Sequence, residues 1–337
     1  MFEGKTVLIT GGTGSLGNAL VERLLDLGIK QIRIFSRNEL KQIEMESKFN
    51  DDRLRFLVGD VRELPRVIRA TEDVDFVFHA AALKHVPKVE YNPFEAIKTN
   101  VQGSQNVIDA CLQNNVQKAI CIGTDKAVSP LNTYGATKLL MEKLFVTAQR
   151  YSNPKKHHTK FVAVRYGNVF GSSGSVIPKF IQQLKNKQKL TMTDSKMTRF
   201  NITMNEALDF ILKSTLHAKG SEIFIPKLKS YILSDVKDAL IELLSDTGSE
   251  SIGIRPGEKL HESLINEDEI SHAFEYENMY VIIDPQYHHE GLEQIYPKIK
   301  RLDNVKKYSS DLAEKLSISE IKKLITDSGF LENHNKT

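Results

Sequence analysis

The sequence predicts an α/β protein, with a doubly wound parallel sheet and a smaller mixed α/β lobe at the C-terminal edge of its strands. Three observations predict this fold. Strands and helices alternate through the first half of the chain, a glycine-rich turn joins the first strand to the first helix, and the alternation stops near Asn168. Repeated βαβ units form parallel sheets that helices cover on both faces.

The first half contains six candidate strands, each a short apolar run bounded by turn residues. They lie at 5–10, 31–36, 54–59, 75–79, 118–123 and 161–166. Helical spacing predicts helices at 15–27, 93–112 and 134–151, and a polar helix that follows the second strand and ends at about Phe49. Because parallel crossovers are almost always right-handed, this order defines a Rossmann-like topology, which we place at residues 1–168.

The second half has a less regular pattern. Helices are predicted at 176–187, 206–219 and 235–244, strands at 190–193, 222–226 and 251–254, and a loop at 171–175. We expect residues 169–285 to form mainly a substrate lobe above the carboxyl ends of the strands, where α/β proteins bind ligands. Residues 286–337 form a charged tail of unassigned role, with one amphipathic helix at 317–326.

Composition excludes several classes of protein. A net charge of +3 over 337 residues gives no basic face for nucleic acid. Cys111 and Cys121 have apolar neighbours, which indicates buried thiols in a reducing compartment. No apolar run approaches the roughly 20 residues of a membrane span, and no signal peptide is evident. We therefore expect a cytoplasmic protein, and no His, Cys or Asp spacing predicts a metal site.

The glycine-rich turn predicts a dinucleotide site. Its G-x-G-x-x-G pattern follows a strand and opens a helix, so that backbone amides and the helix dipole face a pyrophosphate. The residues expected to form this part of the site are Gly11, Thr13, Gly14, Ser15, Leu16 and Gly17.

The next strand ends indicate which dinucleotide is bound. The second strand ends at Ser36 and Arg37 rather than at an acidic residue, and an arginine can pair with a 2′-phosphate. This favours NADP over NAD, although a solvated Arg37 stays an alternative. Further cofactor contacts are expected from the ends of the third and fourth strands, at Asp60, Val61, Ala80 and Ala81, and from Lys84 and Asn100.

Tyr134 and Lys138 form a candidate catalytic pair. Residues four apart on a helix share a face, so both can point into one cleft. A nearby ammonium would lower the pKa of the phenol from about 10 toward the working pH. Thr124, Asp125 and Lys126 follow the preceding strand and place a hydroxyl, an acid and an amine beside the pair.

The motifs together resemble an extended short-chain dehydrogenase/reductase that acts on nucleotide sugars. Several segments are similar to those of UDP-N-acetylglucosamine 4,6-dehydratases of the 5-inverting, pseudaminic acid type; they are 82–87, 90–93, 98–100, 124–127, 165–169, 197–200 and 255–262. The likeness covers about residues 5–285. Retaining enzymes of the family have Glu where this chain has Lys126.

The resemblance implies a three-part reaction with no net redox change. Tyr134 would take the proton of the sugar C4 hydroxyl, and Lys138 would hold the nicotinamide ribose. Lys126 would abstract the C5 proton, as a buried lysine of lowered pKa, and Asp125 would donate to the leaving C6 hydroxyl. Thr124 would bind the C4 hydroxyl. The group that reprotonates C5 is left open.

The resemblance also implies the partners. The UDP-sugar would be bound by Lys84, Thr124, Asn168, Lys179, Arg199, Arg255 and Glu258. Relatives assemble as homo-oligomers, some of them hexamers. Three alternatives stay open: a UDP-sugar 4-epimerase, a retaining 4,6-dehydratase, and a dinucleotide-binding sensor without turnover.

Overall fold

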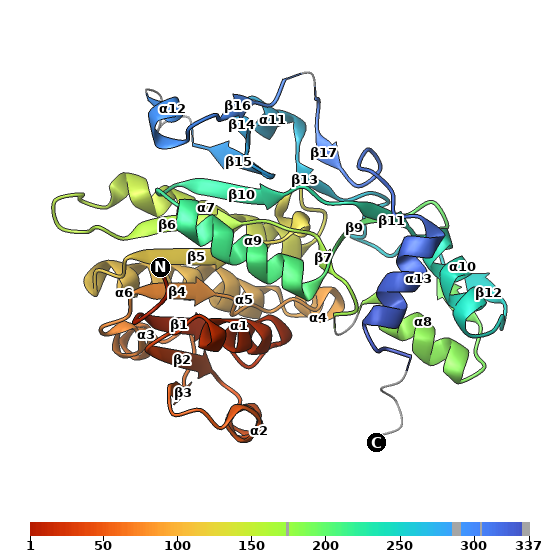
Figure 1. Ribbon diagram of the computed structural model, residues 1–337, viewed down its shortest axis with the longest axis horizontal. Helices are drawn as coiled ribbons and strands as arrows, with labels where there is room; N and C mark the ends of the chain where they lie inside the picture. The colour runs from red at the N-terminus through yellow and green to blue at the C-terminus, as the bar shows by residue number, and fades with distance from the viewer. Residues whose placement is uncertain (173–174, 285–290, 304, 332–337) are drawn as a thin grey trace.

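The computed structural model describes residues 1–172, 175–284, 291–303 and 305–331. Within them, ten strands form the main sheet in the spatial order β16-β14-β15-β10-β6-β5-β4-β1-β2-β3 (Figure 1). β3, β2, β1, β4, β5, β6 and β10 run parallel, and β15, β14 and β16 continue the sheet antiparallel. The strands are β1 Thr6–Thr10, β2 Gln31–Ser36, β3 Leu54–Val58, β4 Phe76–His79, β5 Lys118–Ile122, β6 Lys160–Val164, β10 Glu222–Pro226, β14 Ala273–Tyr276, β15 Met279–Ile283 and β16 Lys300–Arg301.

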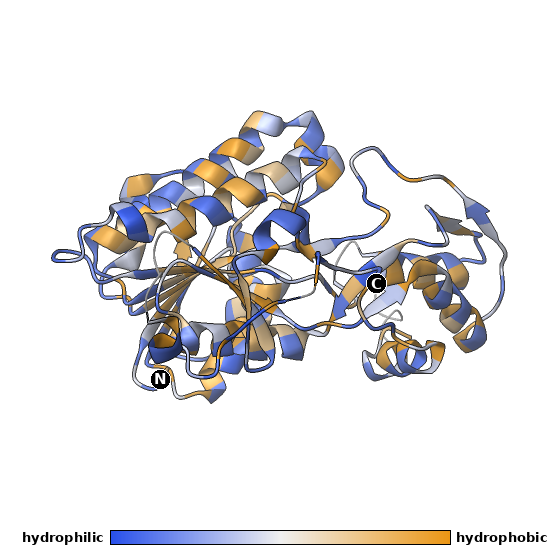
Figure 2. Ribbon diagram, turned by 90° about the horizontal axis from the view of Figure 1, so that it is seen from above, coloured by the Kyte–Doolittle hydropathy of each residue, from blue (hydrophilic) through white to orange (hydrophobic). Residues whose placement is uncertain are grey.

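Helices cover both faces of this sheet. One hydrophobic core packs α1 and α9 against the strands, and a second packs α3, α6 and α7 against the other face. Apolar residues are concentrated along the strands and on the helix faces turned toward them (Figure 2). The helices are α1 Ser15–Asp26, α2 Glu39–Phe49, α3 Leu64–Thr71, α4 Val86–Tyr91, α5 Pro93–Ala96, α6 Gly103–Gln113, α7 Thr133–Tyr151 and α9 Met204–His217. The predicted α/β fold is thus confirmed.

The smaller lobe has its own core, formed by α8, α10 and α13 (Figure 1). Its helices are α8 Val176–Lys185, α10 Leu233–Leu243 and α13 Ile318–Asp327. Three small sheets lie outside the main sheet: β11 Ser230–Ile232, β9 Thr198–Ile202 and β7 Asn168–Val169; β12 Ser249–Ser251 and β8 Leu190–Met192; β13 Ser263–Ile265 and β17 Tyr308–Ser309. Two short helices, α11 Glu267–Ile270 and α12 Leu292–Ile295, flank β14 and β16 in sequence.

The structure adds elements that were not predicted, α3, β14 and β15 among them, and three other differences are notable. The helix predicted at 93–112 is interrupted by a π-helical segment, η1 Ile97–Gln102, in which Asn100 bonds to a neighbouring loop. The strand predicted at 251–254 lies earlier, at β12. The segment 198–202, not predicted as a strand, is β9, and all five of its residues are buried.

The division at residues 168 and 285 stays a prediction, but the strands bear on it. β10, β14 and β15, all beyond Asn168, join the main sheet rather than the lobe. In the tail, β16 also joins the main sheet, β17 pairs with β13, and α13 packs against α10. The main sheet therefore contains strands from both halves of the chain.

Candidate active site

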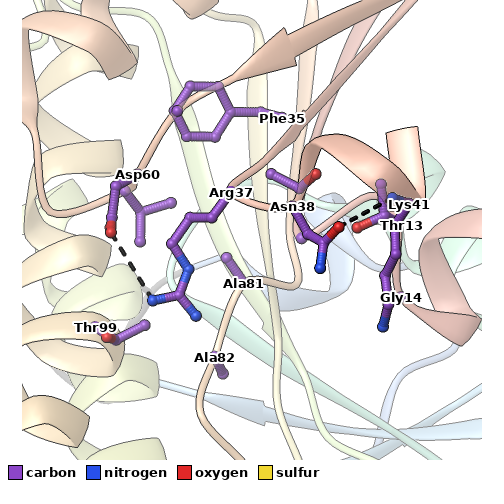
Figure 3. A pocket seen from close by; sticks show the side chains of 14 residues that line it. Thr13, Gly14, Phe35, Arg37, Asn38, Lys41, Asp60, Ala81, Ala82 and Thr99 are labelled. Carbon is purple, nitrogen blue, oxygen red and sulfur yellow. Dashed lines mark hydrogen bonds and ion pairs between the residues drawn. The ribbon is translucent and has the colours of Figure 1, made fainter. Parts of the chain in front are cut away.

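A cavity of about 350 Å³ opens at the carboxyl ends of β1, β2 and β4 (Figure 3). Its lining includes eight of the residues predicted for the cofactor: Gly11, Thr13, Gly14, Ser36, Arg37, Asp60, Val61 and Ala81. It also includes six that the prediction missed: Phe35, Asn38, Lys41, Gly59, Ala82 and Thr99. Phe35 and Gly59 sit within the predicted strands, so their position on the sheet edge could have indicated them.

Two glycines shape the turn around this cavity. Gly11 has φ +69°, and a Cβ added there would lie 2.8 Å from the Cα of Ala81, so a side chain would close the space between the first and fourth strand ends. A Cβ on Gly17 would lie 2.2 Å from the carbonyl oxygen of Gly12, so α1 packs directly on the turn. Gly14 is the N-cap of α1. This backbone cradle fits a dinucleotide pyrophosphate.

The β2 end of the cavity is basic. Arg37 is more than half exposed, and its guanidinium lies 3.9 Å from Asp60 (Figure 3). Asp60 pairs more closely with Arg62, at 2.7 Å; burial opposes the charge of Asp60, but the hydrogen bonds from Arg62 outweigh it and hold the pKa of that carboxyl low. Asn38 caps α2 by accepting a hydrogen bond from the Lys41 backbone at 3.0 Å. Arg37 and Lys41 are two cations in the cavity lining.

The other predicted cofactor residues lie outside the cavity lining. They are Ser15, Leu16, Gly17, Ala80, Lys84, Asn100, Tyr134 and Lys138. Asn100 is fully buried, and its amide bonds both the backbone of Leu83, at 2.7 and 3.0 Å, and Thr137, at 3.0 Å. It therefore fixes the loop after β4 to α7. Lys84, on that loop, is exposed.

The predicted catalytic residues converge where η2 (Asp125–Ala127), a 3-10 turn after β5, meets α7. Thr124 caps this turn and donates to Asp125 at 2.9 Å. Lys126 Nζ donates to Asp125 Oδ1 and to Asn168 Oδ1, each at 3.0 Å. Asp125 is fully buried, and its Oδ2 has no hydrogen-bond partner among the described residues. An acid and an amine are thus in contact beside Tyr134.

The pKa values of Tyr134 and Lys126 differ from the expected ones. Burial raises the pKa of Tyr134 to about 12, and Lys126 and a hydrogen bond with Thr124 only partly offset it. Burial would lower the pKa of Lys126, but the carboxylates of Asp125 and Glu262 outweigh burial and raise it. The expectations of a phenol near working pH and of a lysine with a lowered pKa are therefore wrong for the ligand-free chain.

Lys138 does not act on the phenol as expected. Its Nζ donates to the carbonyl of Ile122 at 2.7 Å and contacts Met141 Sδ at 3.1 Å. Burial lowers its pKa. The cation that favours the phenolate of Tyr134 is Lys126. The carbonyl of Ile122, at the end of β5, thus holds the Lys138 ammonium.

The residues predicted for the substrate fall into two groups. Asn168 on β7 and Arg199 on β9 lie close to Lys126, and Arg199 Nη2 lies 3.2 Å from Glu258. Lys179 on α8 lies farther out and donates to Thr191 at 2.6 Å. Burial and the neighbouring Arg255 lower its pKa. Arg199, Glu258, Lys179 and Arg255 thus form a charged path from the catalytic residues toward the surface.

Two charged residues at the centre of the site were not predicted. Glu262 is 3% exposed, and its Oε1 lies 3.8 Å from Lys126 Nζ and 4.0 Å from Arg199 Nε. Lys259 lies 3.9 Å from Glu262 and donates to the carbonyl of Val128. Both belong to the 255–262 segment noted for its resemblance, which was the available signal. Tyr231, which is buried on β11, lies beside these charged residues.

Two features are absent from the described residues. No three His, Cys, Asp or Glu side chains there are grouped as metal ligands. No described helix combines the length and the apolar character that crossing a bilayer requires.

Comparisons with known proteins find a matching family model, similar sequences and a similar solved structure. The family model described as "Polysaccharide biosynthesis protein" matches residues 7–284. A UDP-N-acetylglucosamine 4,6-dehydratase (inverting) of Campylobacter jejuni is 49% identical over 284 residues, 84% of each chain. A UDP-glucose 4-epimerase of Rickettsia conorii is 40% identical over 346 residues, 100% of this chain and 99% of the relative. The X-ray structure of Pen from Bacillus thuringiensis superposes with a TM-score of 0.89 at 41% identity, over 98% of this chain and 99% of that one.

Proposed function

Because this chain belongs to the polysaccharide biosynthesis protein family, we propose that it is a UDP-N-acetylglucosamine 4,6-dehydratase that inverts C5. The product would be UDP-2-acetamido-2,6-dideoxy-β-L-arabino-hex-4-ulose, with the pseudaminic acid pathway as its use. The observation that carries the proposal is the contact between Asp125 and Lys126 beside Tyr134. An epimerase needs the tyrosine, but elimination of water also needs an acid and a base at neighbouring carbons. The Campylobacter relative supports the same reaction.

The cofactor is proposed to be NADP, because Arg37 and Lys41 are both available to a 2′-phosphate at the β2 end of the cavity. When bound, the nicotinamide would accept hydride from C4 and return it to C6. The turn at Gly11 and Gly14 would hold the pyrophosphate, and Asp60 would face the adenosine side. Lys138, adjusting from its contact with Ile122, would reach the nicotinamide ribose.

The chain's own residues would move the protons. Tyr134 takes the proton of the C4 hydroxyl, with the hydroxyl of Thr124 beside it. Asp125, a carboxylate paired with Lys126 in the free chain, must be protonated before it gives a proton to the C6 hydroxyl as water leaves, and Lys126 takes the C5 proton. Since Lys126 is an ammonium in the free chain, it must lose a proton before it can act as a base. Arg199, Arg255 and Lys179 would bind the diphosphate.

A UDP-sugar 4-epimerase is the second candidate. The Rickettsia relative supports it, because that match covers 100% of this chain, whereas the dehydratase match covers 84%. Asp125 and Lys126 argue against it, since epimerisation requires rotation of the keto sugar rather than elimination. A retaining dehydratase differs only in the product.

The test is to incubate the protein with UDP-N-acetylglucosamine in D₂O and to follow the sugar by proton NMR. A 6-deoxy-4-keto sugar with deuterium at C5 and L-arabino couplings is expected. D-xylo couplings would replace inversion by retention, and UDP-N-acetylgalactosamine would mean an epimerase. Lys126→Ala and Tyr134→Phe should each abolish the product while NADP binding persists. Turnover by Tyr134→Phe would contradict the proposed first step, in which Tyr134 takes the proton of the C4 hydroxyl.

We further propose that the chain forms a homo-oligomer. Tyr91 on α4 and Phe94 on α5 are large apolar side chains that are 86% and 63% exposed. Light scattering coupled to size-exclusion chromatography would test it, and a monomer at micromolar concentration would contradict it.

A further inference from the structure

Glu262 links three cations from three parts of the chain. Its Oε1 lies 3.8 Å from Lys126 on η2 and 4.0 Å from Arg199 on β9, and its Oε2 lies 3.9 Å from Lys259. The side chain is 4% exposed, and Oε2 has no hydrogen-bond partner among the described residues. A buried carboxylate in this state is stabilised by ion pairs rather than by hydrogen bonds.

The charges around Glu262 balance. Three cations, Lys126, Arg199 and Lys259, face three carboxylates, Asp125, Glu258 and Glu262. All six side chains are less than one-third exposed. Removing one carboxylate would therefore leave an unpaired positive charge in a poorly solvated cluster, where a lysine responds by releasing its proton.

The hydrogen bonds of Lys126 show which proton can leave. Its ammonium has three N–H groups, and two of them donate to Asp125 and Asn168. The next carboxylate oxygen is that of Glu262, at 3.8 Å. A neutral amine keeps two N–H groups, so it can retain both hydrogen bonds and release the third proton toward Glu262.

We propose that Glu262 is a positioning residue that acts through Lys126: its carboxylate holds the ammonium and takes the third proton when the amine is needed. In this step an N–H bond of Lys126 breaks, an O–H bond forms on Glu262, and both charges disappear. Taking the C5 proton makes Lys126 an ammonium again. It then passes a proton to Asp125, which has given its own to the C6 hydroxyl, and the reverse transfer from Glu262 restores the pair. The catalytic use of this transfer rests on the proposed dehydratase function.

The electrostatic surroundings of Lys126 support the proposal. Burial lowers its pKa, Asp125 and then Glu262 raise it, and Arg199 lowers it. Tyr134, from α7, also faces it. Burial lowers the pKa of Lys259, and Lys126 is close enough to lower it further. Glu262 is thus the one carboxylate from outside the 125–126 turn, within the described residues, that acts on this amine.

The amine itself can be probed without turnover. Competitive acetylation with a limiting amine reagent at pH 8, read by mass spectrometry, reports the neutral fraction of Lys126 relative to exposed lysines such as Lys196. Glu262→Gln should raise the Lys126 rate by about tenfold or more, because an opposite charge this close changes a pKa by roughly one or more. Glu258→Gln is the matched control, since Glu258 lies in the same segment but pairs with Arg199. It should leave the Lys126 rate within about twofold, which corresponds to a much smaller change in pKa.

An unchanged Lys126 rate in folded Glu262→Gln would overturn the proposal. If that variant does not fold, Glu262→Asp is tested instead: it keeps the carboxylate, so Lys126 should be acetylated at close to the wild-type rate. Acetylation of Lys126 at the rate of the unfolded chain, in a folded Asp variant, would equally overturn the proposal. Because acetylation needs no substrate, a changed rate with no conversion of UDP-N-acetylglucosamine would refute only the proposed function. In an active enzyme, Glu262→Gln should also move the Lys126 limb of the kcat/KM profile to lower pH, which a merely structural role would not do.

Discussion

The Cα of Gly135 lies directly against the backbone of Lys126: a Cβ added at Gly135 would be 2.3 Å from the carbonyl oxygen of Lys126. The first turn of α7 therefore touches η2, and this contact sets Tyr134 beside Asp125. Asn132 keeps the helix start in place by capping Gly135 N at 2.8 Å.

Gly135→Ala should impair catalysis more than folding. Alanine favours a helix by about 1 kcal/mol over glycine, but overpacking against backbone costs about 1–3 kcal/mol, so we expect a small net loss of stability. Displacement of Tyr134 by about 1 Å should lower kcat by about 100-fold. Steady-state kinetics and thermal unfolding measure both, and Ala136→Ser, exposed on the same turn, is the control. A wild-type kcat in Gly135→Ala would contradict the role of this contact.

Arg37→Ala should weaken NADP binding and leave NAD binding nearly unchanged. A charge-assisted hydrogen bond contributes about 1.5–3 kcal/mol, so the Kd for NADP should rise by about 10- to 100-fold. Calorimetric titration with each dinucleotide measures this, and Arg69→Ala, an exposed arginine of α3 away from the cavity, is the control. Equal weakening for both dinucleotides would assign Arg37 to the shared part of the cofactor, and no weakening would leave it solvated.

The sequence was sufficient to predict what local patterns control. The glycine turn, the ends of β2, β3 and β4, and the Tyr134 helix follow from spacing and from the rule that parallel strands end at one edge. The strand β9 was missed because its five residues, all of them buried, mix polar and apolar types without the regular alternation of a half-buried strand. The break in the 93–112 helix coincides with two hydrogen bonds between the Asn100 amide and the backbone of Leu83, which no local pattern encodes.

The electrostatics of the site could not be predicted, because they depend on residues distant in sequence. Spacing alone paired Tyr134 with Lys138, yet burial and the carbonyl of Ile122 direct Lys138 elsewhere. The carboxylates that raise the pKa of Lys126 are Asp125 and then Glu262, which lies 136 positions farther along the chain (262 − 126) and reaches the site through the turn before β13. Only the folded chain brings these groups within a few ångströms.

The stability of the protein should fall on acidification, partly through His79. This imidazole is fully buried between Thr10 and Ser104, and burial, followed by the charge of Lys138, lowers its pKa to about 3. The unfolded chain binds a proton near pH 6.5, so the contribution is complete above that pH and is lost as pH falls toward 3. A tenfold difference in proton affinity between the folded and the unfolded chain corresponds to about 1.4 kcal/mol.

His79→Gln should therefore flatten the decline in unfolding free energy between pH 6.5 and pH 4, measured by urea titration at each pH, relative to wild type. His85→Gln, on an exposed loop position, should leave the decline unchanged. An identical decline in His79→Gln and wild type would show that His79 is protonated in the folded chain.

The buried ion pair between Arg165 and Glu142 should be costly to break from one side only. Both side chains are fully buried; Arg165 lies 2.5 Å from Glu142 on α7 and 2.8 Å from Glu269 on α11, and also donates to the carbonyl of Leu264. Arg165→Met removes the cation from the fully buried Glu142 and from the less buried Glu269, and should lower the unfolding free energy by about 3–5 kcal/mol. Adding Glu142→Leu removes that orphaned charge, so the double variant should recover much of the loss, as guanidinium unfolding of both variants would measure. A double variant less stable than Arg165→Met would mean that Glu142 holds α7 against β6 through contacts other than this pair.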